Sequence, residues 1–138
     1  MEKSAINEKK KEYLRGYQRA REREKRIEDE IQRLREDKMF PSLLIDDMPH
    51  GTDKKDLSDY AAKLDAHIRD LSDELDNKAK IYADITKRLK RLNNSTEQDV
   101  LMLKYIAGMS WQEIAEEMGY SLQHTYRLHG RALNNFEI

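Results

Sequence analysis

The sequence has no cysteine, little proline or glycine, and no long hydrophobic run. Among 138 residues there are two prolines and five glycines. Without cysteine the chain can form neither a disulfide framework nor a thiolate metal site. No run of about 18 apolar residues exists, so we expect no membrane span, and no apolar core of a secretory signal follows Met1. Few Gly and Pro with abundant Glu, Lys, Arg and Leu is the composition of long helices, which predicts an all-α protein.

Charge is nearly balanced but unevenly distributed. The chain carries 26 Lys+Arg and 27 Asp+Glu, a net charge of −1. Residues 1–40 carry +3, residues 41–92 carry −1 and residues 93–138 carry −3. Basic residues cluster at Lys9–Lys11, at Arg19–Arg26 and at Lys87–Arg91. Such clusters suit nucleic-acid phosphates, although on a helix they are more often a solvated face.

Two stretches follow a heptad repeat, which predicts coiled-coil helices. The first apolar row is Ile6, Lys10, Tyr13, Tyr17, Ala20, Glu24, Ile27, Ile31 and Leu34. The second row is Leu57, Ala61, Leu64, Ile68, Leu71, Leu75, Lys78, Tyr82, Ile85, Leu89 and Leu92. We predict helices over about 4–37 and 56–93, joined by a loop at 38–55 that contains both prolines.

Two such helices predict an antiparallel hairpin over residues 1–93. A pairing in which residue numbers sum to about 91 would place His67 opposite Glu24. Because a two-helix arm buries only a narrow row of side chains, we expect it to pair with another copy, with a homodimer favoured. The alternative for this half is a simple spacer rod.

Residues 94–138 have the start and stop signals of a three-helix, helix-turn-helix domain. Ser95 or Thr96 is the expected cap of the first helix, and Ser110 with Glu113 forms a capping box for a short second helix. Gly119 ends that helix, and Ser121 caps the last one. A helix-turn-helix needs a small residue where its two helices cross, a glycine in the turn and an inward apolar set. These requirements predict the core of the domain, and we expect Tyr120 to face inward as well. The core set is Ile114, Ala115, Met118, Gly119, Leu122 and Leu128.

The outward face of the last helix carries side chains that suit DNA. Arginine pairs with guanine edges, and glutamine or asparagine pairs with adenine. The predicted base-facing residues are Gln123, His124, Tyr126 and Arg127. The predicted phosphate contacts are Ser121, Arg131, Lys87, Arg88, Lys90 and Arg91.

The segment from Thr96 to Ser121 resembles region four of bacterial sigma factors, on the core Gly108-Met109-Ser110-Trp111-Gln112-Glu113-Ile114-Ala115. The whole architecture is similar to RinA/ArpU-type phage late-operon regulators. Residues Asp47–Gly51 and Asp56–Asp65 also resemble those phage proteins. The resemblance implies a DNA-binding regulator of phage or prophage genes in the cytoplasm of a bacterial host, with RNA polymerase as a possible further partner.

Three features depart from that family. Leu128 stands where arginine is common, the segment is acidic, and Gly130 interrupts the last helix at a cost of about 1 kcal/mol relative to alanine. Phosphate contacts dominate DNA affinity, so an acidic head predicts modest affinity and dependence on oligomerisation.

Nothing in the sequence indicates an enzyme, a cofactor or a metal. The four histidines are scattered, and no glycine-rich phosphate loop or nucleophile motif occurs. His124 and His129 lie on different faces of one helix, which favours packing or DNA contact over metal binding. Trp111 is expected to pack in the small domain.

The leading hypothesis is therefore a sequence-specific transcriptional regulator that binds double-stranded DNA through the helix-turn-helix. Two alternatives remain open. One is a DNA-packaging accessory that resembles a small terminase subunit. The other is a protein-interaction adaptor for RNA polymerase or another regulator.

Overall fold

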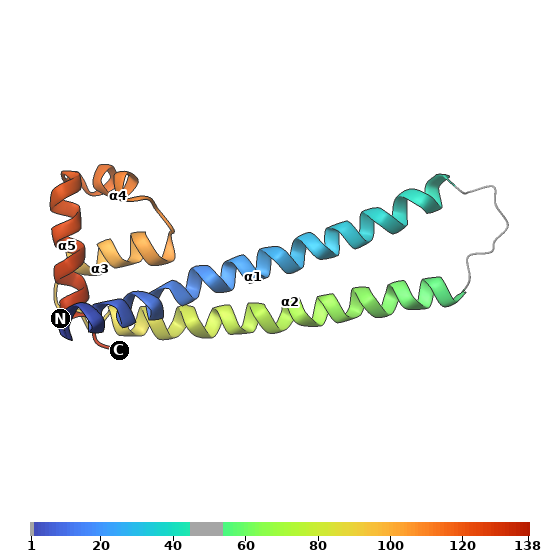
Figure 1. Cartoon of the computed structure of the whole chain (residues 1–138), viewed down its shortest axis with the longest axis horizontal. Coiled ribbons are helices and arrows are strands. Elements are labelled where there is room, and N and C mark those ends of the chain that lie inside the picture. The colour runs from blue at the N-terminus through green and yellow to red at the C-terminus, as the bar shows by residue number, and fades with distance from the viewer. Residues whose placement is uncertain (1, 45–53) are drawn as a thin grey trace. The chain divides into compact units, whose positions relative to one another are not determined.

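A computed structural model describes residues 2–44 and 54–138 of the chain. In these ranges the secondary structure is entirely helical (Figure 1), as the composition predicts. The segments are α1 (Glu2–Leu44), α2 (Lys54–Leu89), α3 (Ser95–Leu101), a π-helical turn η1 (Met102–Ile106), α4 (Trp111–Met118) and α5 (Leu122–Asn135).

The two long helices exist as predicted, with different ends. The prediction that helix one stops near residue 37 is wrong, because α1 continues through Pro41 to Leu44. A proline inside a helix removes one backbone hydrogen bond. Because Pro41 lies in the last turn of α1, the helix continues only to Leu44. Likewise α2 ends at Leu89 rather than at residue 93. The predicted loop residues 45–53, including Asp47–Gly51, lie outside the described residues.

The chain divides into two compact units. Unit 1 comprises Met1–Ala20 and Lys78–Ile138, and unit 2 comprises Arg21–Asn77. This division by contacts differs from a boundary at residue 94, because the first half of α1 and the last turns of α2 group with the helix-turn-helix segment.

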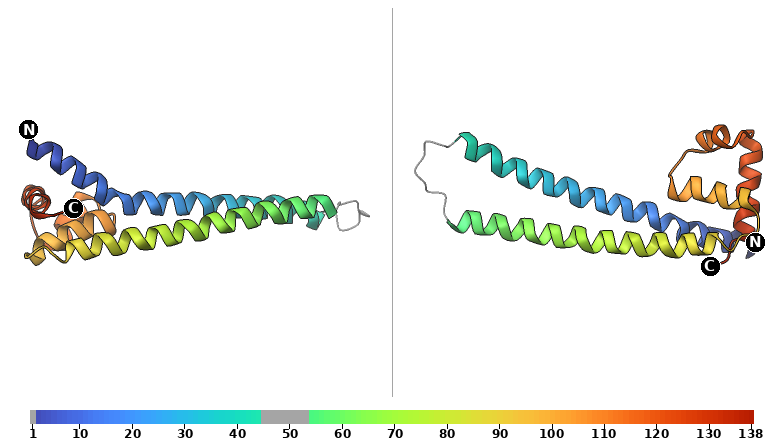
Figure 2. Two further views of the ribbon diagram at one scale, coloured as in Figure 1. Left: turned by 90° about the horizontal axis from the view of Figure 1, so that it is seen from below. Right: turned by 180° about the vertical axis from the view of Figure 1, so that it is seen from behind.

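Within each unit α1 and α2 lie antiparallel (Figure 2). In unit 1 the rings of Tyr17 and Tyr82 are 5.6 Å apart. In unit 2 the Nε of Arg23 lies 2.9 Å from Glu74 Oε1, and His67 Nδ1 lies 3.7 Å from Glu30 Oε2.

These pairs correct the predicted register. Their residue numbers sum to 97 or 99, so His67 lies opposite Glu30 and not Glu24. The reason is that α1 ends seven residues later than predicted, at Leu44 rather than near residue 37, so the midpoint between the two helices falls at a higher residue number.

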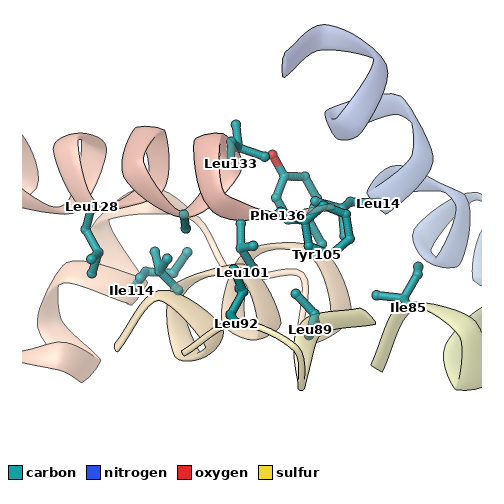
Figure 3. Packing of buried hydrophobic residues seen from close by; sticks show 12 residues of the cluster. Leu14, Ile85, Leu89, Leu92, Leu101, Tyr105, Ile114, Leu128, Leu133 and Phe136 are labelled. Carbon is teal, nitrogen blue, oxygen red and sulfur yellow. The ribbon is translucent and has the colours of Figure 1, made fainter. Parts of the chain in front are cut away.

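The hydrophobic core lies in unit 1 and draws on all of its helices (Figure 3). Leu14 of α1 is fully buried, although it falls between the positions of the predicted heptad row. The members of this core are Leu14, Ile85, Leu89, Leu92, Val100, Leu101, Tyr105, Ile114, Leu128, Ala132, Leu133 and Phe136. The start of α1 is therefore a structural part of the C-terminal head.

Candidate nucleic-acid interface

Both ends of α4 have the local chemistry that the sequence predicts. Ser110 Oγ accepts from the Glu113 amide, and the Glu113 carboxylate accepts from the Ser110 amide, which completes the capping box. These bonds lower the pKa of Glu113. Gly119 ends α4 with φ of 72°, a left-handed conformation that glycine adopts without steric cost.

The start of α5 is fixed just as locally. Ser121 is its N-cap, and its Oγ accepts from the His124 amide at 3.0 Å. The buried Thr125 hydroxyl donates to the Ser121 carbonyl at 2.9 Å. At α3, however, the predicted cap is wrong: Asn94 caps that helix, one residue before Ser95. An asparagine side chain reaches the same amides as serine does.

The predicted core residues are mostly buried. Ile114, Ala115 and Leu128 are buried, and Met118 packs against the core. The exceptions are Gly119, which is exposed at the end of α4, and Leu122 and Tyr120, each 37% exposed. Leu122 is the first residue of α5, beyond the end of the buried stripe. The ring of Tyr120 lies edge-on against His124, with centroids 4.6 Å apart.

The outward face of α5 presents the predicted DNA-facing side chains. Gln123, Arg127 and Arg131 are exposed, His124 is half-buried, and Tyr126 is 48% exposed. Among residues 2–44 and 54–138, neither Arg127 nor Arg131 has an acidic partner. The face thus combines hydrogen-bonding groups with two available guanidinium groups.

The predicted phosphate cluster at Lys87–Arg91 lies at the other end of α5. Arg88 and Arg91 line a polar cavity of about 430 Å³ together with Asn135 and Glu137. From Gln123 to Asn135 is twelve residues, about 18 Å along a helix. Arg88 is also paired with Asp84 at 3.2 Å. Arg131 therefore lies on the exposed face of α5. The Lys87–Arg91 cluster does not lie near the N-terminal end of α5.

Sequence reasoning missed one cation beside the face. Lys104 Nζ lies 4.6 Å from the centroid of the Trp111 ring. The Trp111 ring in turn meets Tyr126 edge-on, with centroids 5.3 Å apart. A cation over an indole ring is a favourable arrangement, and it places Lys104 next to α5. No motif spacing could have shown this, because the π-helical turn changes the direction in which residue 104 points.

A buried polar pair links α5 to the π-helical turn η1. The Tyr105 hydroxyl and His129 Nε2 are hydrogen-bonded at 2.8 Å, and the Trp111 ring meets His129 edge-on at 4.6 Å. Burial, assisted by the charges of Lys11, Lys104 and Arg15, lowers the pKa of His129 to about 4. Burial raises the pKa of Tyr105 to about 12. Both groups are therefore neutral near pH 7, and His129 packs in the head as the sequence suggested.

Helix α1 caps two helices of the head. Lys10 Nζ donates to the Leu133 carbonyl at 2.8 Å, at the end of α5. Gln18 Nε2 donates to the carbonyls of Tyr105 and Ile106 at 3.2 and 2.8 Å, at the end of η1. Carbonyls at a helix C-terminus lack intrahelical partners, so these contacts satisfy groups that would otherwise need water.

These features form a helix-turn-helix with a capped, exposed second helix. Residues 89–135 match the family described as Sigma-70, region 4. This segment is a sigma-70 region 4 helix-turn-helix domain. The family is one of DNA-binding domains, and the match covers about a third of the chain.

Other comparisons gave nothing: no curated protein and no solved structure matches the chain. In the described ranges, no helix is both long and apolar enough for a membrane span. The same residues contain no group of three or more His, Asp or Glu side chains arranged to hold a metal ion.

Proposed function

We propose that the protein is a sequence-specific DNA-binding transcriptional regulator of phage or prophage origin, without enzymatic activity, that acts in the bacterial cytoplasm. The observation that carries the proposal is the exposed face of α5, with Arg127 and Arg131 unpaired among the described residues, in a sigma-70 region 4 domain. Gln123, His124, Tyr126 and Arg127 contact base edges in the major groove. The phage assignment rests on the resemblance of the whole architecture to RinA/ArpU-type regulators.

Phosphate contact is divided between two groups of residues. Ser121, Arg131 and Lys104 contact the backbone beside the groove in which α5 lies. Lys87, Arg88, Lys90 and Arg91, at the far end of α5, contribute a longer-range attraction that salt screens within about 10 Å at 0.1 M. The core residues Ile114, Ala115, Met118 and Leu128 hold α4 against α5, and Gly119 allows the turn between these helices.

The test is DNA binding as a function of salt concentration. Duplexes selected from a random library by the full-length protein serve as ligands. For Arg127→Ala with Arg131→Ala we expect the slope of log affinity against log salt to fall by about two, because two phosphate or base-edge charges are lost. The control is Lys63→Ala with Lys80→Ala, which makes the same charge change at exposed residues of α2. Absence of salt-dependent binding by the wild type would contradict the proposal.

Oligomerisation through unit 2 is the second part of the proposal. The predicted row on α2 leaves Leu57, Ile68 and Leu75 exposed at 60%, 43% and 39% in the single chain. These side chains repeat at heptad-compatible spacing on one face, which is the pattern of a helix that packs on another helix. A second copy of the same hairpin offers the same row, so two hairpins form a four-helix bundle and a homodimer.

Sedimentation velocity tests the dimer. Ile68→Lys with Leu75→Lys is expected to shift the protein to monomer, because it places charges within the shared row. Ala62→Lys with Ala66→Lys adds the same charge on the opposite face of α2 and is expected to leave the dimer intact. A wild type that is monomeric at high micromolar concentration contradicts this part, and a large ring favours the packaging alternative.

The adaptor alternative has one supporting observation, the exposed carboxylates of Glu116 and Glu117 on α4. RNA polymerase is the expected partner in that case. The Arg127→Ala, Arg131→Ala variant separates the two functions, because an adaptor retains its protein partner when these arginines are removed. If partner binding persists and the wild type shows no DNA binding, the adaptor is the correct function.

A further inference from the structure

Gly130 lies in the interior of α5, and nothing inside the chain requires a glycine there. Its backbone is ordinary helix, since Gly108 and Gly119 are the glycines with positive φ among the described residues. A Cβ built at Gly130 meets no atom within 4 Å. Alanine would therefore fit, and it would favour the helix more than glycine does.

The absence of a side chain leaves a notch on the exposed part of α5. Tyr126 and Asn134 lie four residues before and after Gly130, and Arg127 and Arg131 lie three before and one after. On a helix the residues three and four positions away, Tyr126, Arg127 and Asn134, are the surface neighbours of position 130. Arg127 and Arg131 are four residues apart and form a row beside the notch, and neither has an acidic partner in the described part of the chain.

We propose that this notch is a contact site for the DNA sugar–phosphate backbone, an inference that rests on the proposed function. A glycine lets a ligand approach the helix backbone more closely than any other residue does. The adjacent row of Arg127 and Arg131 selects an anionic ligand, and a phosphodiester seated on the backbone at Gly130 lies within reach of cationic side chains. The cost of glycine to the free helix is then offset only when DNA is bound.

A protein partner is the competing occupant. A second copy of the chain that packed a helix at Gly130 would also need a small residue there. The flanking charges disfavour this occupant, because two copies related by symmetry would bring Arg127 and Arg131 of both chains together. The experiment below distinguishes the two by measuring oligomer mass along with DNA affinity.

The experiment compares Gly130→Ala and Gly130→Met with a matched control, Gly16→Ala. Gly16 is also a glycine inside a helix, and its Cβ would lie 3.8 Å from Ile81 Cγ2, an ordinary contact. Both alanine substitutions should raise Tm by about 2–5 °C, because both replace glycine in a helix interior. They differ only in their position relative to the proposed DNA face.

DNA affinity then decides. We expect Gly16→Ala to bind selected duplexes as the wild type does. Gly130→Met should bind about five- to a hundredfold more weakly, because it overfills the contact, and Gly130→Ala should show a smaller loss. The salt slope should fall by about one for Gly130→Met as the phosphate is displaced.

The outcomes separate the inference from the proposed function. If the wild type shows no salt-dependent binding, the proposed function fails. If the wild type binds and both Gly130 variants bind equally well, the notch inference alone is overturned. A Gly130 variant that changes oligomer mass while DNA affinity stays constant also overturns it and assigns the notch to a second copy.

Discussion

Units 1 and 2 share the helices α1 and α2, yet their interiors differ. Of the buried hydrophobic side chains in the described residues, Ile31 is in unit 2 and all the others are in unit 1. In unit 1 four further helical segments, α3, η1, α4 and α5, pack with the two long helices. In unit 2 the two long helices pack only against each other, so Leu57, Ile68 and Leu75 of the apolar row on α2 remain exposed. A heptad row on a pair of helices therefore leaves apolar side chains accessible, whereas their burial requires further elements that cover the row.

The largest expected difference in stability is between two isoleucine-to-alanine substitutions on α2, one in each unit. Ile85→Ala, in the core of unit 1, should lower the free energy of unfolding by about 2–5 kcal/mol. Ile68→Ala, in unit 2, should cost less than about 1 kcal/mol in the monomer, because the side chain is 43% exposed. Urea unfolding at low protein concentration measures both. Equal losses would mean that the two units are packed alike.

The next difference concerns pH. The pKa of His129 is about 4 in the folded head, against 6.5 for an ordinary histidine. The unfolded chain therefore binds more protons between these values, and the unfolding free energy should decrease by up to about 3 kcal/mol as pH falls from 6.5 to 4. The stability that the neutral His129 contributes is fully present above pH 6.5.

A histidine variant locates this pH dependence. His129→Gln in unit 1 should flatten the dependence of stability on pH between 4 and 6.5. The measurement is the unfolding free energy at several pH values. A pH dependence that stays as steep in His129→Gln as in the wild type would contradict this prediction.

A smaller effect is expected where α1 caps the head. Lys10→Met should destabilise unit 1 by about 1 kcal/mol, because the carbonyls at the end of α5 lose a charged donor. Lys9→Met removes the same charge from an exposed neighbour and should have almost no effect. Thermal unfolding of both variants checks this. A larger loss for Lys9→Met would show that total charge, not capping, is responsible.

The smallest effect is expected in unit 2. Arg23 and Glu74 form an ion pair at 2.9 Å that is partly exposed. A double-mutant cycle with Arg23→Ala and Glu74→Ala should give a coupling energy below about 1 kcal/mol. A coupling above about 2 kcal/mol would show that the pair is desolvated and that unit 2 has a polar core of its own.

The sequence predicted the parts of the fold that depend on local signals. The capping box at Ser110, the left-handed Gly119 and the Ser121 cap all involve residues within four positions of one another. The two long helices were also predictable, because their apolar rows repeat many times. Three members of the candidate face, Gln123, Arg127 and Arg131, are exposed as the helical periodicity indicates.

Features that depend on distant contacts were not predictable. Leu14 is buried in a cluster that includes residues of the head as well as Ile85 and Leu89 of α2, whereas the repeat placed it outside the row. The register moved because α1 continues past Pro41, which no spacing rule reveals. The approach of Lys104 to Trp111 depends on the π-helical turn, and the capping by Lys10 and Gln18 joins residues that are 87 or more positions apart in sequence.

The most direct test of the central claim is to map, by NMR, the backbone amides that shift when a selected DNA duplex is added to the full-length protein. The account predicts that the largest shifts fall in α5, at Gln123, His124, Arg127 and Gly130 to Arg131. It also predicts smaller shifts near Lys104 and none in residues 21–37 of unit 2. Shifts confined to unit 2 or to the Lys87–Arg91 cluster, with α5 unchanged, would contradict it.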